Sequence, residues 1–192
     1  MKIIFDFDDT LSDNKNIKDR LYSALHEIGI SYQKAEEYYK EERATDRPFS
    51  MKKFLEHTLD LENKNLGLIP KMYEGILSPL PQMVNKDLLE MAKKVGKENC
   101  YIVTHGDEEY QEDKIGMSGI KEYFSEIHVV PGTKKEIIAD ICQRNPSEII
   151  IFVDDKEKYF ADLDMNRCSN LKTILFDQNG LEKLKEEIKS HP

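Results

Sequence analysis

Acidic side chains directly follow two short apolar segments of the chain. Asp6 and Asp8 end the first segment, and Asp154 and Asp155 end the fourth. Residues two apart in an extended chain face the same way, so the carboxylates of Asp6 and Asp8 should lie close together. Such a pair is stable only where a cation lies between the two groups or where one of them stays protonated. Oxygen ligands gathered without histidine or cysteine favour Mg²⁺, which keeps several waters and accepts a substrate phosphate.

A hydroxyl group and a lysine follow two further apolar segments. Thr104 ends the second segment, and Lys134 opens the helical pattern after the third. Several acids, one hydroxyl and one lysine meet the needs of phosphoryl transfer, in which a nucleophile attacks phosphorus while cations and a donor take up charge on its oxygens. Lys135 is the alternative lysine. We favour Lys134, because it precedes Ile137 and Ile138 by three and four residues and so shares their sheet-facing stripe.

Five β-rich segments are predicted to form the sheet that positions these groups. They are Lys2–Phe7, Cys100–Thr104, Glu126–Val130, Ile149–Val153 and Leu171–Phe176. Most are continuous apolar runs, which indicates strands buried on both faces, as in a parallel sheet. The helical patterns around the later strands are Lys86–Val95, Glu108–Ile115, Lys134–Gln143, Lys156–Leu163 and Leu181–Lys189. This alternation predicts an α/β doubly wound parallel sheet, which binds ligands at the carboxyl ends of its strands.

A helical insertion interrupts the alternation after the first strand. Its predicted helices are Ile17–Ile28, Tyr32–Arg43, Met51–Leu61 and Gly67–Ile76. Ser31 and Ser50 stand where helix N-caps are expected. Pro79 and Pro81 stiffen the return to the core, where we expect a hinge without helix. We therefore predict a core domain of residues 1–11 and 80–192 and an inserted α-helical domain of residues 12–79.

The order of these motifs resembles that of the haloacid dehalogenase-like (HAD) superfamily of phosphohydrolases. The first motif, FDFDDTL at residues 5–11, is the most specific. A hydrophobic strand ending in Thr104, a lysine that opens a helix, and the pair Asp154 and Asp155 follow it in order. The resemblance covers the whole predicted core and implies a Rossmann-like HAD core. The helical insertion is similar to the helical cap of this superfamily's first cap type.

The resemblance implies a catalytic role for each motif residue. Asp6 would be the nucleophile that forms an aspartyl-phosphate, and Asp8 would be the general acid for the leaving oxygen and then the base for water. Thr104 would donate a hydrogen bond to the transferring phosphoryl group. Lys134 would steady Asp6 and the phosphate charge.

The resemblance also implies a magnesium site and two supporting residues. Asp154, with or without Asp155, would hold Mg²⁺ together with the carboxylate of Asp6 and the backbone carbonyl of Asp8. Thr10 would support the loop through its hydroxyl. The superfamily often has Asn after the threonine of the second motif, whereas this chain has His105, which either binds substrate or caps the loop.

The function predicted from these motifs is Mg²⁺-dependent hydrolysis of a small phosphorylated metabolite, and alternatives stay open. A phosphomutase would use the same groups, and a catalytically idle phosphate- or metabolite-binding protein could keep the same fold. A dehalogenase would have no leaving oxygen for Asp8 to protonate. A phospho-switch of the receiver type would need its phosphorylated aspartate after the third strand, which instead ends in Val129 and Val130.

Composition limits the partners. The chain has 192 residues and a formal charge of −9, which disfavours nucleic acid polymers and anionic membranes. Acidic residues interrupt the apolar N-terminal segment, so no export signal is predicted there. The three cysteines are widely separated and predict reduced thiols. We expect a cytoplasmic protein, a monomer or a homodimer, whose partner is a small phosphorylated metabolite.

The helical insertion offers candidates for substrate contact. The basic candidates for binding an anionic substrate are Arg43, Arg47, Lys52 and Lys53, although each by itself is typical of an ordinary surface residue. Four tyrosines at helical spacings are expected to pack between the helices rather than to contact substrate: Tyr22, Tyr32, Tyr38 and Tyr39.

Overall fold

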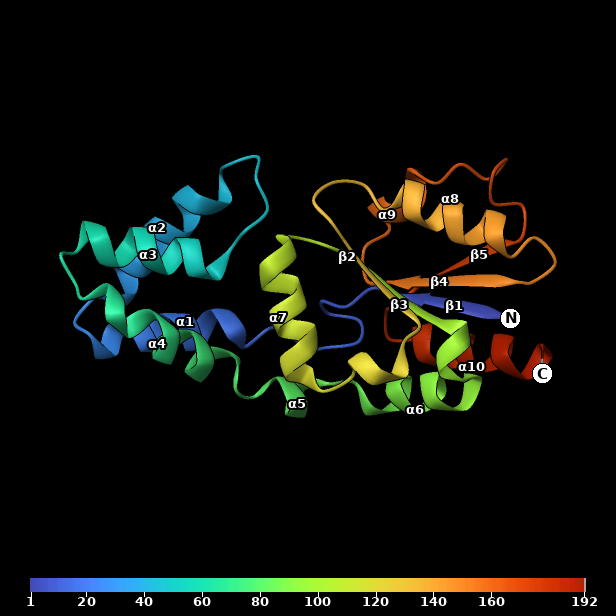
Figure 1. Cartoon of the computed structure of the whole chain (residues 1–192), viewed down its shortest axis with the longest axis horizontal. Coiled ribbons are helices and arrows are strands. Elements are labelled where there is room, and N and C mark those ends of the chain that lie inside the picture. The colour runs from blue at the N-terminus through green and yellow to red at the C-terminus, as the bar shows by residue number, and fades with distance from the viewer. Residues whose placement is uncertain (192) are drawn as a thin grey trace.

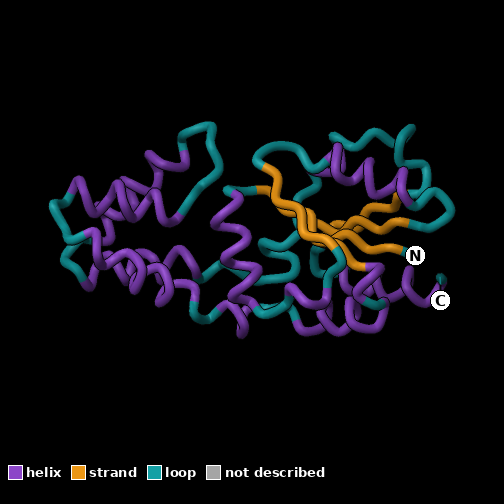
Figure 2. Tube along the Cα trace, viewed as in Figure 1, coloured by secondary structure: helices purple, strands orange, loops and turns teal. Residues whose placement is uncertain are grey.

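The computed structural model describes residues 1–191 and has two lobes (Figure 1). One lobe contains the sheet and both ends of the described chain, and the other contains only helices and their connections (Figure 2). The strands are β1 (Lys2–Phe5), β2 (Cys100–His105), β3 (Glu126–Val130), β4 (Ile150–Asp154) and β5 (Leu171–Leu175). All neighbouring pairs are parallel, in the order β3-β2-β1-β4-β5. The predicted α/β doubly wound parallel sheet is confirmed.

Helices cover both faces of the sheet. The helices from residue 80 onward are α5 (Leu80–Met83), α6 (Lys86–Val95), α7 (Glu108–Ser118), α8 (Lys135–Arg144), α9 (Lys158–Ala161) and α10 (Gly180–Ser190), with short 3₁₀ turns at Lys97–Asn99 and Lys121–Tyr123. Of these, α5 packs through Leu80 into the core of the helical lobe. Phe5 faces α6 and α10, where it packs in one core with Leu88 and Leu184. Ile4 faces the other way, into a second core with Ile138 of α8. Burial on both faces explains why the strands read as continuous apolar runs.

The helical lobe has a core of its own. Its helices are α1 (Ile17–Glu27), α2 (Tyr32–Arg43), α3 (Met51–Leu61) and α4 (Ile69–Leu77), with a 3₁₀ turn at Leu66–Leu68 before α4. Leu21, Leu25, Phe54 and Leu55 are fully or almost fully buried between them. The predicted division at residues 11/12 and 79/80 stays a prediction.

Helix α7 joins the two lobes. Tyr110 of α7 packs in the core of the helical lobe, although α7 follows β2 in the sequence. Lys52 of α3 forms ion pairs with Glu109 and Asp113 at 2.7 and 2.8 Å, and Lys53 pairs with Asp107 at 3.3 Å. The contact between the two lobes is therefore partly apolar and partly ionic.

Local expectations fail at three places. The Ser31 side chain accepts a hydrogen bond from the Lys34 N–H as predicted, but Ser50 makes no such bond at the start of α3. The return at Pro79 and Pro81 is helical, because α5 takes both prolines at its start, where a missing N–H costs nothing. The helix predicted from residue 156 begins only at Lys158, after a turn.

No helix within residues 1–191 is both long enough and apolar enough to cross a membrane.

Candidate active site

Two aspartates meet at the centre of the sheet edge. The apolar residues of β1 end at Phe5, and the Asp6 N–H then donates to the Val153 carbonyl at 2.9 Å. Phe5 pairs with Val153 in the register of β1 and β4, so Asp6 and Asp154 leave adjacent strands at the same level. Their residues are 4% and 0% exposed. The chain turns back from β3 to β4 across β1, so this edge is the switch point where doubly wound sheets bind ligands.

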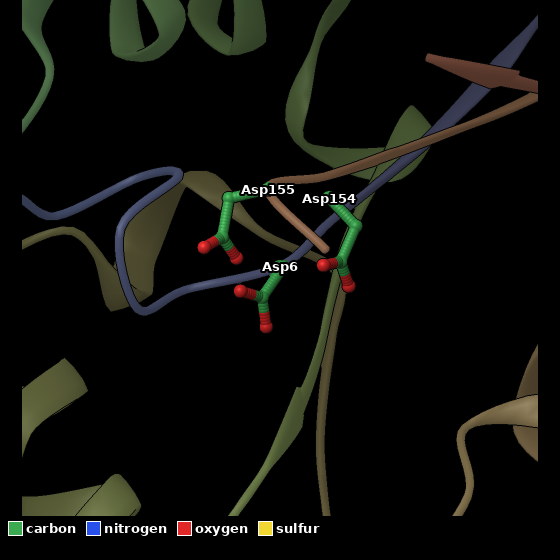
Figure 3. Close-up of side chains that lie close together, drawn as sticks. All are labelled: Asp6, Asp154 and Asp155. Carbon is green, nitrogen blue, oxygen red and sulfur yellow. The ribbon is translucent and has the colours of Figure 1, made fainter. Parts of the chain in front are cut away.

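Three carboxylates gather there. Asp6, Asp154 and Asp155 each place one oxygen within 4.8 Å of the others, and their carboxylates converge from the ends of β1 and β4 (Figure 3). The ammonium of Lys134 donates to Asp6 Oδ1 at 2.6 Å and to Asp154 Oδ2 at 2.5 Å. Lys134 is 1% exposed, whereas Lys135 lies on the surface.

The charge of this cluster fits a divalent cation. The three carboxylates have one buried lysine, Lys134, beside them. Within residues 1–191, the only other cation paired with them is Lys156, whose exposed side chain contacts Asp155 at 3.3 Å. Hard carboxylate oxygens without histidine or cysteine are the donor set of Mg²⁺. Asp6, Asp154 and Asp155 could therefore hold this ion.

Burial governs the titration of the cluster. Burial raises the pKa of Asp6 to about 7; the ammonium of Lys134 opposes this rise, and the charge of Asp154 adds to it. Burial also raises the pKa of Asp154 despite its contact with Lys134. A bound cation would compete with protons for these oxygens.

Asp8 is held away from this cluster by three donors. Gln111 Nε2 donates to Asp8 Oδ2 at 2.7 Å, while Lys114 and Asn14 both donate to Oδ1. Burial raises the pKa of Asp8, but the charge of Lys114 and the hydrogen bond from Gln111 outweigh it and hold this pKa below its ordinary value. The Asp8 carboxylate is thus kept ionised, the form that accepts a proton.

Sequence reasoning missed Gln111 and Lys114. Both are almost fully buried, and they lie three residues apart on the inward stripe of α7, next to Tyr110 and Ile115. Polar residues on an otherwise apolar helical stripe were the available signal. Glycine at position 106 leaves the room that the Gln111 side chain occupies, because a Cβ there would lie 2.5 Å from Gln111 Nε2.

Thr104 presents a free hydroxyl. It lies on β2, is 1% exposed, and its Oγ1 is buried without a hydrogen-bond partner among residues 1–191. A buried hydroxyl without a partner is costly, so a ligand that accepts its hydrogen bond would be favoured. The Thr10 hydroxyl is also buried without a partner in the described chain, so the predicted support of the loop through this hydroxyl is wrong.

A cavity of about 480 Å³ opens above these groups and between the two lobes. Asp6, Asp8, Thr104, His105 and Lys134 all line it. Asp154 and Asp155 lie next to Asp6 in the acidic cluster and are not part of the lining. The structure thus brings every predicted site residue to one place, although the Asp8 side chain contacts α7 rather than the other acids.

His105 and Tyr159 form one side of the cavity. Their ring centroids are 6.1 Å apart. The ammonium of Lys134 lies over the ring of Tyr159, 4.3 Å from its centroid, in a cation–π contact. Burial lowers the pKa of His105, and the charges of Lys158, Lys134 and Arg43 lower it further. His105 is therefore neutral near pH 7, and Tyr159 is a wall residue that the sequence did not indicate.

The candidates from the helical lobe divide into two groups. Arg43 and Arg47 line the cavity, whereas Lys52 and Lys53 pair with acids of α7 instead.

The tyrosines divide in the same way. Tyr22 and Tyr38 donate to Glu36 and Glu62 within the lobe. Tyr39 packs against Tyr22, Phe49 and Phe54, as expected, and it also lines the cavity.

No protein-family model matches the chain, and no curated protein matches it. Solved structures do match. A proposed haloacid dehalogenase-like hydrolase from Burkholderia xenovorans LB400 is 22% identical, with a TM-score of 0.70 over 99% of this chain and 88% of the other. A 2-haloacid dehalogenase from Pseudomonas syringae pv. Tomato DC3000 is 15% identical, with a TM-score of 0.64, and a proposed β-phosphoglucomutase from Thermotoga maritima is 14% identical, with a TM-score of 0.63; each match covers 100% of both chains. The fold implied by the motif order is confirmed.

Proposed function

We propose that this chain, which has the haloacid dehalogenase-like fold, is a Mg²⁺-dependent phosphomonoesterase that acts on a small phosphorylated metabolite through an aspartyl-phosphate on Asp6. One observation carries the proposal. A buried carboxylate that belongs to an acidic cluster, and that shares a lysine with a second acid, lines the same cavity as an unpartnered threonine hydroxyl. This combination supplies a nucleophile, a cation site and a donor for phosphoryl oxygens.

Asp6, Asp154 and Asp155 would hold the magnesium ion. When bound, the ion offsets the negative charge that otherwise keeps a carboxylate and a phosphate apart. Lys134 contributes a second, fixed positive charge beside Asp6.

In the first step, an oxygen of Asp6 forms a bond to phosphorus while the bond from phosphorus to the leaving oxygen breaks. The leaving oxygen takes a proton from Asp8 when Asp8 carries one. Thr104 donates its unused hydrogen bond to a phosphoryl oxygen. Because Lys114 favours the ionised form of Asp8, leaving groups that need no proton should depart most readily.

In the second step, the ionised Asp8 takes a proton from water as the water oxygen attacks phosphorus. The bond between phosphorus and the Asp6 oxygen breaks, which frees inorganic phosphate and restores the Asp6 carboxylate. The donors on Asp8 keep it in the form that this step needs. We also propose that the helical lobe acts as a cap that excludes bulk water while the chemistry proceeds.

Other reactions of this fold use fewer of these groups or need more. Cleavage of a carbon–halogen bond needs neither a general acid nor a cation cluster for phosphoryl oxygens. A phosphomutase would use the same groups but would have to exclude water between two transfers. These two reactions, and a binding protein without turnover, are distinguished by their products.

The test is release of phosphate from 4-nitrophenyl phosphate, with Mg²⁺ and with excess chelator. We expect turnover that requires Mg²⁺ and that Asp6→Asn abolishes, since Asn is nearly isosteric but not nucleophilic. Circular dichroism of Asp6→Asn shows whether its fold persists. Undiminished turnover in this variant, or with chelator, would contradict the proposal. With a sugar phosphate as the substrate instead, an isomerised product without free phosphate would indicate a mutase, and binding without turnover an idle protein.

A further inference from the structure

The cavity is cationic although the protein is acidic. Its lining contains seven lysine or arginine residues and four aspartates, which gives it a formal charge of +3, whereas the whole chain carries −9. The seven basic residues are Lys18, Arg43, Arg47, Lys114, Lys134, Lys156 and Lys158. Basic residues are therefore concentrated at this cavity, in contrast to the acidic balance of the whole chain.

Most of these cations already have a partner. Lys134 and Lys114 pair with the catalytic acids, and Lys156 pairs with Asp155. Lys18 pairs with Glu36 at 2.9 Å, and Arg47 pairs with Glu42 at 3.2 Å.

Arg43 and Lys158 are different, because neither has a carboxylate partner in the described chain, residues 1–191. The ammonium of Lys158 lies only over the ring of Tyr159, 4.8 Å from its centroid. Asp46 is an exposed acid of the same cavity, and it offsets part of this charge without an ion pair to either residue.

These two cations come from opposite lobes and act on one region. Arg43 is the last residue of α2 in the helical lobe, and Lys158 is the first residue of α9 in the sheet lobe. Both line the same cavity as Thr104 and as His105, which directly follows it on β2, and both charges lower the pKa of His105. A ligand whose phosphoryl group is at Asp6 would extend past His105 toward them.

The wall around this path is partly aromatic. Tyr39 and Phe49 of the helical lobe, Tyr110 of α7 and Tyr159 of the sheet lobe line the same cavity. A carbon skeleton can pack against these rings while its polar ends face the cations. The volume of about 480 Å³ is that of a small-molecule site rather than a polymer groove.

Resting on the proposed function, we propose that Arg43 and Lys158 form a subsite for a second anionic group on the leaving-group side of the substrate. The preferred substrates are then phosphomonoesters that carry a carboxylate or a second phosphate, rather than phosphomonoesters of neutral alcohols. An arginine fork binds either anion through two parallel hydrogen bonds, and Lys158 adds a point charge from the opposite lobe. Because one cation comes from each lobe, such a substrate would also bridge the two lobes.

Three synthetic substrates of equal carbon number test this subsite. They are n-butyl phosphate, 3-carboxypropyl phosphate and butane-1,4-diyl bisphosphate, each assayed for phosphate release with Mg²⁺. We expect kcat/KM to be about tenfold or more higher for one or both of the doubly anionic esters than for n-butyl phosphate. The ranking of the carboxylate and the bisphosphate shows which anion the subsite takes.

Substitution assigns the preference to these residues. Arg43→Gln and Lys158→Gln should each reduce the ratio of kcat/KM, doubly anionic over neutral, by about fivefold to tenfold, mainly through KM. Lys94→Gln, which removes an exposed lysine of α6 outside the cavity, should leave the ratio unchanged.

The outcomes separate this inference from the proposed function. Mg²⁺-dependent hydrolysis with equal kcat/KM for all three esters would leave the phosphomonoesterase intact and overturn the subsite. A preference that survives both substitutions would also overturn it. No phosphate release from these esters or from 4-nitrophenyl phosphate would overturn the proposed function, and the subsite with it.

Discussion

The cavity has two walls that are built in opposite ways. On the sheet wall, Asp6, Asp154 and Lys134 are almost completely buried and bonded to one another. On the wall of the helical lobe, Arg43 and Arg47 are exposed, and the ion pair of Arg47 is with Glu42 of its own lobe. The reacting groups are thus fixed by strand register and burial, whereas the groups suited to recognition can change without disturbing the fold.

This difference has an energetic consequence. Removing one partner of a buried ion pair costs about 3–5 kcal/mol, because it leaves a charge without compensation. Removing an exposed ion pair costs about 0–1 kcal/mol. Substitution of the buried residues of the sheet wall should therefore reduce stability and turnover together, whereas substitution of exposed cavity residues should change selectivity alone.

The largest effect is expected from Lys134→Met. This change leaves the buried carboxylates of Asp6 and Asp154 without their lysine, so it should reduce kcat by about 10²–10³-fold and the free energy of unfolding by about 3 kcal/mol. Turnover assays and urea unfolding measure the two effects. Lys135→Met is the matched control, because Lys135 is the exposed neighbour and should behave like the wild type. Equal effects of the two variants would refute the assignment of Lys134.

Lys114→Met should have an intermediate effect. Lys114 lowers the pKa of Asp8, and the ionised Asp8 is the base of the second step, so removing Lys114 should move the ascending limb of the pH profile of kcat to higher pH. We expect kcat to fall about tenfold near neutral pH, since a smaller fraction of Asp8 is ionised. The fold should persist, because Asp8 keeps its hydrogen bonds from Gln111 and Asn14 and its side chain is 27% exposed.

The control for Lys114→Met is Glu112→Gln. Glu112 is an exposed residue of the same helix, so its substitution should leave the pH profile in place. An ascending limb at the same pH in Lys114→Met and in the wild type would show that Lys114 does not govern Asp8.

Magnesium affinity should depend on pH through Asp6. The pKa of Asp6 is raised from 3.8 to about 7, so the folded protein holds a proton that the unfolded chain has already lost. Without metal, the contribution of Asp6 to stability is therefore greatest below about pH 4 and falls as the pH rises to about 7. Because Mg²⁺ must displace this proton, its affinity should rise by up to about tenfold per pH unit until about pH 7 and then level off.

Calorimetric titration in buffers of different ionisation enthalpy measures both the affinity and the protons released. Asp6→Asn should flatten most of the pH dependence, and the remainder should come from Asp154, whose pKa burial also raises. An affinity that does not change between about pH 5 and about pH 7 would exclude Asp6 as a ligand.

The sheet wall was predictable from sequence because its chemistry depends on position along the chain. Asp6, Thr104 and Asp154 each end an apolar strand, and parallel strands bring such ends to one edge. Single-residue features were enough for that inference. Helical patterns along the chain likewise predicted the bounds of α2 and α3, at Tyr32–Arg43 and Met51–Leu61.

The other wall was not predictable, because it depends on how helices from distant parts of the chain meet. Arg43 and Lys52 are both basic residues of exposed helical surfaces, and only the position of α7 directs Lys52 to Glu109 and leaves Arg43 in the cavity. Gln111 was missed for a related reason. A helical stripe indicates which residues turn inward, but not that this stripe of α7 meets Asp8.

The smallest effect is expected where the lobes meet on the surface. Lys52→Gln removes ion pairs to Glu109 and Asp113, yet Tyr73 still donates to Asp113 at 2.9 Å, so no buried charge loses its partner. We expect the free energy of unfolding to fall by less than about 1 kcal/mol, and less at high salt, which screens such pairs.

The comparison with Lys53→Gln sharpens this expectation. Lys53 makes one longer contact, to Asp107 at 3.3 Å, so its loss should be smaller still in urea unfolding. A larger loss of stability from Lys52→Gln than from Lys134→Met would reverse the contrast between the walls. It would mean that the apolar contact around Tyr110 does not hold the lobes together by itself, and that the exposed ion pairs of α7 set the position of Arg43 over the catalytic acids.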